Sequence, residues 1–254
     1  MAIYYNNRPI VTDGLEYYVD AANTKSYPGT GNTWFDIAGV STLYDGTLVN
    51  SPTISSEGLS SFDFNGTSQA IEIDKDVPFA EDDNVGNLTR EVWFNCDDVT
   101  PNTEQILWED GGTSNGISIY IHSGSLYAGL WSSSDGFSGA WPSSSIESGK
   151  WYHVCLSLLG AGSSPPTTDA LKFHLNGSLV DTADSTWLNS HTDGTGGHGI
   201  GRINGGTKTH LGTISGDLRW FDGKVAMVRA YHKKGLTDAE VKQNFNALRG
   251  RFDI

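Results

Sequence analysis

Long apolar runs and thiols are scarce in this chain of 254 residues. No stretch approaches the roughly 18 consecutive apolar residues that a membrane-spanning helix needs, so we predict no membrane insertion. The opening residues, MAIYYNNRPIV, lack the basic segment and apolar core of a secretory signal, which predicts synthesis in a cytoplasm. The two cysteines, Cys96 and Cys155, lie in apolar strand-like runs without a C-x-x-C spacing, and we expect both to be reduced and packed.

Basic residues are also scarce, because 16 lysines and arginines face 30 aspartates and glutamates, giving a formal net charge of −14. This charge repels polyanions and therefore argues against nucleic-acid binding. It leaves many carboxylates for a hard cation such as calcium, which binds oxygen ligands on irregular loops. The calcium candidates are Asp20, Asp36 and Asp110, although no D-x-D-x-D-G spacing is present and Asp-Gly pairs more often form turns.

Glycine and aromatic residues are abundant instead, at 31 residues and 11% of the chain. Alternating aromatic segments separated by Gly-rich turns are typical of antiparallel sheets. Asn176-Gly177, between the alternating segments 170–175 and 178–182, predicts a β-hairpin. Further strands are predicted at 15–19, 46–49, 61–64, 69–73, 90–95, 116–122, 125–131, 150–158 and 223–232. No linker divides the chain, so the pattern indicates one all-β, two-sheet antiparallel sandwich over residues 1–254.

One short helix is predicted near the C-terminus. Thr237 and Glu240 have the spacing of a capping box, and Gly250 suits the residue that follows a helix. The apolar stripe that packs on the sandwich consists of Val241, Phe245 and Leu248.

The two ends of the chain carry apolar residues outside the sandwich pattern. Residues 1–12 form a candidate N-terminal arm, and residues 236–254 form the helix and a tail. We expect these ends to dock on neighbouring molecules, including other copies of the chain in a homo-oligomer.

Three long segments, 131–149, 159–169 and 183–210, carry little strand pattern, and long loops often carry function. Exposed aromatic side chains in such loops stack on sugar rings, and they are equally typical of protein interfaces. A glycan and a protein partner therefore both stay open as ligands. The candidate contact residues are Trp131, Phe137, Trp141 and Trp187.

An ordered set of segments resembles laminin-G-like, concanavalin A-like domains over about residues 14–248. Those segments are SFDFNGTSQAIEI, TREVWFNCDD, GKWYHVCLSL, LKFHLNGSLV and FDGKVAMVRAYHKKGLTDAEVKQNF. The resemblance implies a concanavalin A-like jelly-roll sandwich with a terminal helix. It does not fix a function, because this fold hosts many.

The segment Glu72-Ile73-Asp74-Lys75-Asp76 is similar to the E-x-D-x-E signature of concanavalin A-like endoglucanases. Alternate strand residues share one face, so three carboxylates could line a cleft. The last position is Asp rather than Glu, however, and Pro78 ends the strand pattern. We therefore expect a solvated strand end and no catalysis, with a glycoside hydrolase using Glu72 and Asp76 as the least favoured alternative.

A narrower resemblance concerns GLEYYVDAANTKSYPGTGNTWFDIAG and EVKQNFNALRGRF, which look like parts of stand-alone jelly-roll proteins of tailed bacteriophages. It implies a non-enzymatic virion surface protein that decorates the head or forms part of the tail or fibre. Its expected partners are other virion proteins, copies of itself and host-cell glycans. A free carbohydrate-binding lectin module is the main alternative.

Overall fold

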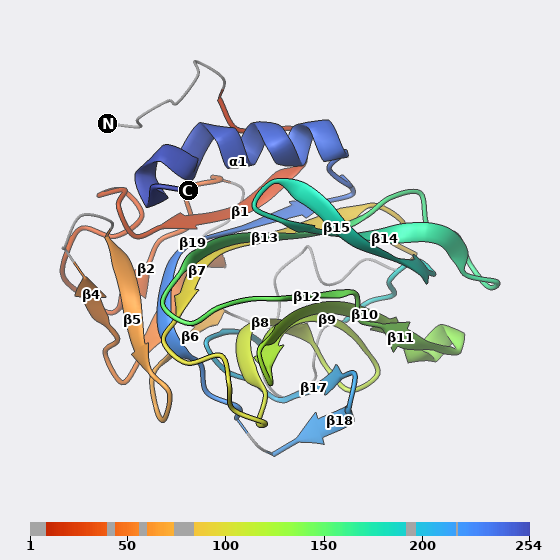
Figure 1. Ribbon diagram of the computed structural model, residues 1–254, viewed down its shortest axis with the longest axis horizontal. Helices are drawn as coiled ribbons and strands as arrows, with labels where there is room; N and C mark the ends of the chain where they lie inside the picture. Colours follow the sequence, from red (N-terminus) through yellow and green to blue (C-terminus); the bar gives the residue numbers. More distant parts are fainter. Residues whose placement is uncertain (1–8, 40–43, 56–59, 74–83, 192–196, 217) are drawn as a thin grey trace.

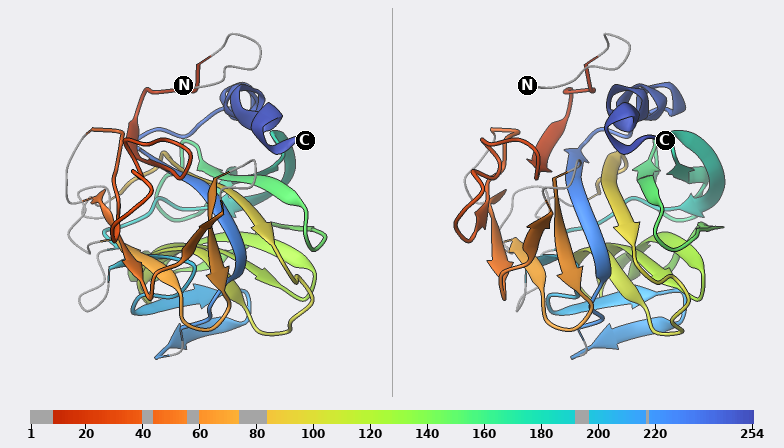
Figure 2. Two further views of the ribbon diagram at one scale, coloured as in Figure 1. Left: turned by 90° about the vertical axis from the view of Figure 1, so that its left-hand side faces the viewer. Right: turned by 60° about the vertical axis from the view of Figure 1, so that its left-hand side comes forward.

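Two antiparallel sheets lie face to face, with a helix on the outer side of one sheet and a small hairpin on the outer side of the other (Figure 1). The computed structural model describes residues 9–39, 44–55, 60–73, 84–191, 197–216 and 218–254. Figure 2 shows the helix and the hairpin at opposite ends of the stack. The all-β, two-sheet jelly-roll sandwich predicted from the sequence is confirmed.

The eight-stranded sheet lies between the helix and the second sheet. Its order is β15 (Ser178–Ser185), β14 (Thr167–Leu175), β13 (Trp151–Leu158), β7 (Leu88–Cys96), β19 (Asp222–His232), β5 (Ser61–Asn65) and β4 (Thr53–Ser55), and β1 (Leu15–Asp20) also pairs with β19. Every residue of the central strand β7 is buried. That strand is covered on both faces, since the second sheet lies on one side and the helix α1 (Asp238–Phe252) on the other.

The nine-stranded sheet includes several strands that alternation did not reveal. Its order is β11 (Phe137–Ala140), β10 (Ser125–Ser132), β9 (Asn115–His122), β8 (Gln105–Gly111), β16 (His198–Ile200), β6 (Ala70–Ile73), β3 (Gly46–Val49) and β2 (Thr33–Trp34), with β12 (Ser143–Ser145) also paired to β10. A separate hairpin is formed by β17 (Gly206–Thr209) and β18 (Gly212–Ser215). The sequence suggested that the segments 131–149 and 183–210 are irregular loops. The structure shows that parts of both segments are strands.

Two-residue turns join neighbouring strands where the sequence has residues that tolerate positive φ. Asn176 and Gly177 have φ of 49° and 69°, and they close the predicted hairpin β14–β15. Asn65-Gly66 has a different role, because β5 and β6 belong to different sheets. Its Asn65 carboxamide oxygen accepts hydrogen bonds from the backbone N–H groups of Thr67 and Ser68, which fixes a turn that crosses from one sheet to the other.

An ion pair joins the two sheets inside the core. Arg90 on β7 is fully buried, and its Nε and Nη2 lie 2.6 and 2.5 Å from Oδ2 of Asp110 on β8. His191 Nε2 and His198 Nδ1 lie 3.0 and 2.9 Å from Oδ1 of the same carboxylate. Burial alone would raise the pKa of Asp110, but Arg90 and the two imidazoles hold it well below its usual range. Asp110 is therefore ionised in the folded protein.

The C-terminal helix begins as the sequence predicts and ends later. The Thr237 side chain accepts from the Glu240 N–H, and the Glu240 carboxylate accepts from the Thr237 N–H, which completes the capping box. The prediction that Gly250 follows the helix is wrong, because the helix continues to Phe252. That extra turn stacks Phe252 on Trp93 of β7, with ring centroids 4.3 Å apart.

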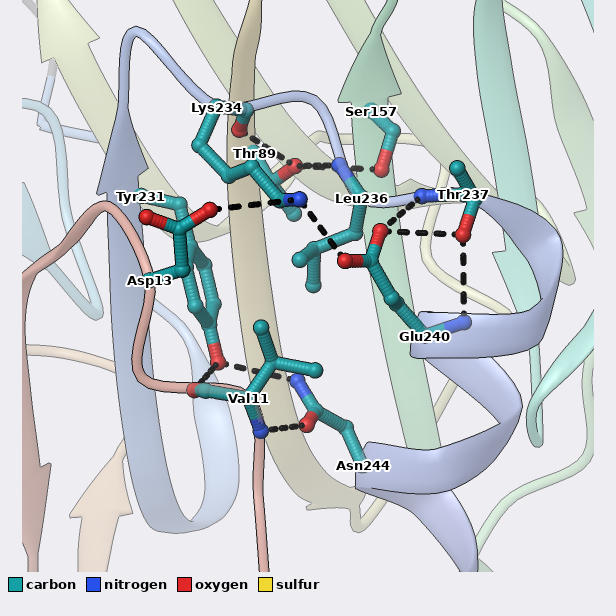
Figure 3. Close-up of polar contacts among 10 residues, drawn as sticks. All are labelled: Val11, Asp13, Thr89, Ser157, Tyr231, Lys234, Leu236, Thr237, Glu240 and Asn244. Carbon is teal, nitrogen blue, oxygen red and sulfur yellow. Dashed lines mark hydrogen bonds and ion pairs between the residues drawn. The ribbon is translucent and has the colours of Figure 1, made fainter.

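The described part of the N-terminal arm lies on the chain's own helix. Asn244 Oδ1 accepts from the Val11 N–H at 2.8 Å, and Tyr231 Oη donates to the Val11 carbonyl at 2.9 Å (Figure 3). Gln243 Nε2 donates to the Pro9 carbonyl at 2.7 Å. Residues 9–12 therefore pack on the helix and on β19 of their own molecule rather than on a neighbouring molecule. Residues 1–8 of the predicted arm lie outside the described residues.

Both cysteines are free and buried, as expected. Burial raises the pKa of Cys96 to about 12, and it raises the pKa of Cys155 well above the usual range. These thiols are therefore protonated and unreactive at neutral pH. Among the described residues no helix is both long and apolar enough to span a membrane.

Replacing Asp110→Ala should destabilise the protein strongly, because it leaves the Arg90 charge enclosed without a partner. We expect the free energy of unfolding to fall by about 3–5 kcal/mol, measured by urea denaturation. Glu147→Ala is the control, since it breaks the exposed Lys150–Glu147 ion pair and should change little. Equal losses in the two variants would contradict a central role for the buried pair.

Candidate functional site

The outer face of the nine-stranded sheet carries a second, smaller apolar core. The hairpin β17–β18 lies against it, and Ser118 Oγ on β9 donates to the Lys208 carbonyl on β17 at 2.8 Å. The buried side chains between hairpin and sheet are Ile106, Tyr120, Ile203 and Ile214. The hairpin covers only part of this face, so the aromatic side chains at its edge stay accessible.

We name these side chains, Tyr120, Tyr127, Trp141 and His210, the aromatic patch. The rings of Tyr127 and His210 stack with centroids 4.2 Å apart and planes 7° apart. Tyr120 and Tyr127 stack at 5.2 Å and 8°. Tyr127 and Trp141 are half-buried and His210 is exposed, whereas Tyr120 is buried beneath them. The patch therefore offers flat apolar surface to solvent on a rigid sheet.

Two glycines allow the indole of Trp141 to lie directly on the backbone of the sheet. A Cβ atom on Gly129 of β10 would lie 2.0 Å from Trp141 Cδ1, and one on Gly139 of β11 would lie 2.4 Å from its Cη2. Any larger residue at Gly129 would push the ring away. Trp141 is thus held in a fixed position next to Tyr127, which precedes Gly129 by two residues on the same face of β10.

Hydrogen bonds hold His210 at the edge of the patch. Its backbone N–H donates to Tyr120 Oη at 2.8 Å, and its Nδ1 lies 2.8 Å from the same oxygen. Burial, and then the neighbouring His122, lower the pKa of His210. The imidazole is therefore neutral at neutral pH and stacks without the hydration shell of a charged ring.

The carboxylates on this face are engaged by a neighbouring segment. Gly199 of β16 lies between Glu72 on β6 and Glu109 on β8 in the strand register. Glu72 forms an ion pair with Arg202, and buried Glu109 accepts the Asn204 N–H at 3.2 Å. Asp74 and Asp76, the other members of the glucanase-like segment, lie outside the described residues.

Of the four aromatic contact residues predicted from the sequence, only Trp141 belongs to the aromatic patch. The prediction of an accessible Trp131 is wrong, because its indole is fully buried over Gly116 and donates to the Gly112 carbonyl at 2.9 Å. Trp187 is half-buried and donates its indole N–H to Asp135 at 2.9 Å. Phe137 is half-buried against the main core.

Tyr127 and His210 were missed by sequence reasoning. Tyr127 alternates with the inward residues Leu126 and Ala128, so the strand period could have placed it on the outer face. Nothing in the local sequence places His210 against it, because 83 positions separate the two residues and only the docked hairpin brings them together.

The three calcium candidates are bound by donors of the protein itself. Asp20 Oδ1 accepts from Arg251 Nη1 at 2.7 Å, and Asp36 Oδ1 accepts from the Tyr18 N–H at 2.7 Å. The assignment of Asp110 to calcium is wrong, because its carboxylate is enclosed with Arg90. The part of the chain that the structure describes contains no group of three or more His, Cys, Asp or Glu side chains placed to hold a metal ion.

The stacked sheets and their connections define a lectin-like jelly roll. The chain belongs to the concanavalin A-like lectin/glucanases superfamily, whose Laminin_G_3 model matches residues 65–242, well over half of the chain. The predicted family resemblance is therefore confirmed. No curated protein matches the sequence.

Among solved structures, the chain resembles receptor-binding domains of botulinum neurotoxins. The binding domain of neurotoxin DC in complex with rat synaptotagmin II has a TM-score of 0.64 and 13% identity, covering 94% of this chain and 52% of that chain. The same domain in complex with SialylT gives 0.63 and 12%, with coverages of 94% and 52%. The chain thus spans about half the length of these structures, and the similarity concerns the fold.

Gly129→Ala should displace Trp141 and loosen the aromatic patch. We expect stability to fall by about 1–3 kcal/mol and the near-ultraviolet circular dichroism of the tryptophans to change. Gly162→Ala is the matched control, since a Cβ there would lie 3.7 Å from Thr167 Oγ1, an ordinary van der Waals distance. Unchanged spectra for Gly129→Ala would show that the indole does not lie on this glycine.

Proposed function

We propose that this chain is a non-catalytic glycan-binding domain and that the aromatic patch is its sugar-stacking surface. The main support for this proposal is the position of Trp141, Tyr127 and His210. These three rings are half-buried or exposed and lie together on one rigid sheet face. Such rings bind the apolar face of a sugar and lose little conformational entropy, because the protein already orders them.

The surroundings of the carboxylates on this face support the absence of catalysis. Retaining glycosidases need two carboxyl groups roughly 5–5.5 Å apart on either side of the scissile bond. Here Glu72 is paired with Arg202, and Glu109 is fully buried. Glu72 is thus held by a cation, and Glu109 is closed off from solvent.

The structural relatives also support a binding role. The solved domain of neurotoxin type G is named a receptor-binding domain, and the binding domain of neurotoxin DC was determined in complex with SialylT. Since this chain covers about half of each of those structures, the likeness supports a binding scaffold and leaves the ligand to be established by experiment.

Trp141→Ala should weaken binding to the neutral glycans that the wild-type protein selects on a glycan array. We expect roughly a tenfold or greater loss of affinity by isothermal titration calorimetry, because a central stacking residue is removed. Phe35→Ala is the control: Phe35 is an exposed aromatic that follows β2, at the opposite end of the nine-stranded sheet from β10.

Two outcomes would contradict this proposal. One is equal glycan binding by Trp141→Ala and the wild type. The other is release of reducing ends from β-glucans by the wild type that Glu72→Gln abolishes, which would establish a glycoside hydrolase instead.

The location we favour for this domain is the virion surface of a tailed phage, on the head, tail or fibre. The support is the resemblance of residues 14–39 and 240–252 to phage jelly-roll proteins. The acidic charge of −14 adds to it, because it disfavours adhesion to nucleic acid. On a particle, many copies of a weak glycan site would act together and raise the avidity for a cell surface.

Phage particles should therefore sediment with the purified protein, which should itself form homo-oligomers. Analytical ultracentrifugation measures both properties. A chain that stays monomeric at high concentration and does not sediment with particles would contradict the virion assignment, while glycan binding would still be tested independently by the Trp141→Ala comparison.

A further inference from the structure

A second depression, which we name the rim pocket, lies between the β5–β6 turn, the β7–β8 loop and the segment before β19. In Figure 1 the turn (orange) and the loop (yellow) both reach the lower edge of the molecule, far from α1. The pocket has a volume of about 360 Å³. It is lined by Asn65, Gly66, Thr67, Asp98, Glu104, Gln105, Asp222, Trp220 and their neighbours.

The lining combines one aromatic ring with hydrogen-bonding groups. Trp220 contributes the ring, whose position is supported by the Arg202 guanidinium 5.3 Å from its centroid. Asn65, Thr67 and Thr103 contribute amide and hydroxyl groups. The pocket volume of about 360 Å³ lies at the small end of the range for ligand pockets. It therefore suits a ligand of monosaccharide or disaccharide size.

The charge of the rim pocket is negative. Its basic residue, Arg219, forms an ion pair with Glu104 at 3.0 Å, which leaves the negative charges of Asp98 and Asp222 in excess. Asp98 Oδ1 already accepts hydrogen bonds from the Thr100 N–H and Oγ1 at 2.9 and 2.8 Å. The Asp222 N–H donates to Gln105 Oε1 at 3.1 Å, and no described residue donates a hydrogen bond to its carboxylate. The nearby Lys224 is engaged by Asp97 at 3.2 Å.

Neighbouring charges make this carboxylate responsive to a cation. Burial, followed by the negative charges of Asp97 and Asp63, raises the pKa of Asp222, and the positive charge of Lys224 offsets this only in part. A positively charged ligand group beside Asp222 would relieve that repulsion, whereas an anionic sugar would increase it.

We infer that the rim pocket binds a sugar that carries a free amine, with the ring against Trp220 and the ammonium group at Asp222. This site is separate from the aromatic patch, which selects flat sugar faces without a charged group. It gives the protein a preference for amino sugars over sialylated ones, and its occupancy does not require the patch.

Glucosamine and N-acetylglucosamine test this inference, because they share a ring and differ in the charge of the nitrogen. We expect calorimetry or ligand-observed NMR to detect glucosamine binding that is roughly tenfold or more tighter than N-acetylglucosamine binding. A sialylated trisaccharide should not bind in the rim pocket. Equal affinities for the two monosaccharides would overturn the inference.

Variants separate this site from the proposed function. Asp222→Asn keeps the shape of the side chain and removes its charge, so it should lower glucosamine affinity about tenfold, and Trp220→Ala should do likewise. Trp141→Ala and the control Asp184→Asn, an exposed carboxylate on β15, should leave it unchanged.

If Asp222→Asn binds glucosamine as the wild type does, the rim pocket is not the site. If Trp141→Ala removes glucosamine binding, the aromatic patch is the site and the inference fails, although the proposed glycan-binding function stands. Circular dichroism of each variant verifies that a loss of binding does not come from unfolding.

Discussion

Arg90 and Asp110 form an ion pair that connects the two sheets within the apolar core. A charge enclosed in this way destabilises the fold strongly unless its partner is in place, so the pair requires β7 and β8 to meet in one register. His191 and His198 contact the same carboxylate, and they bring the chain on either side of residues 192–196 to this point. The strand β16 is thereby fixed beside β8.

The opposite face of β7 also carries a buried charge that needs partners, and these come from neighbouring strands and the helix. Glu91 is fully buried, and it is held by His153 at 2.5 Å and by Arg229 at 3.1 Å on the two neighbouring strands. Asn244 of α1 donates to the same carboxylate at 3.1 Å and also receives the Val11 N–H. The helix therefore covers a charge as well as apolar rings, and it carries the N-terminal arm with it.

The two proposed ligand sites lie at the margins of this structure. The centre of each outer face is covered, by α1 on one side and by β17–β18 on the other. The aromatic patch lies where the hairpin stops, and the rim pocket lies where loops from both sheets meet. The aromatic patch rests on strands tied to the core, so its side chains are ordered without a ligand, which would reduce the entropic cost of binding.

The sequence by itself determined the sandwich, its main strands, the β14–β15 hairpin and the start of the helix. These features depend on local signals: alternation, an Asn-Gly pair and a capping box act between residues a few positions apart. The lack of a strand pattern over residues 131–149 predicted Trp141 as a contact residue. The same reasoning failed for Trp131, because a residue at the end of a strand is exposed or buried according to what packs over it.

Only the tertiary structure decided which residues form the sites. His210 meets Tyr127 because the hairpin folds over the sheet, and Trp220 lines the same pocket as Asp98 because β19 lies beside β7. The candidate calcium ligands likewise contact Arg90, Arg251 and backbone N–H groups, and no local sequence pattern predicts these contacts. Pairing between distant residues depends on the register of both sheets, and that register is set by the packing of the whole core rather than by any single segment.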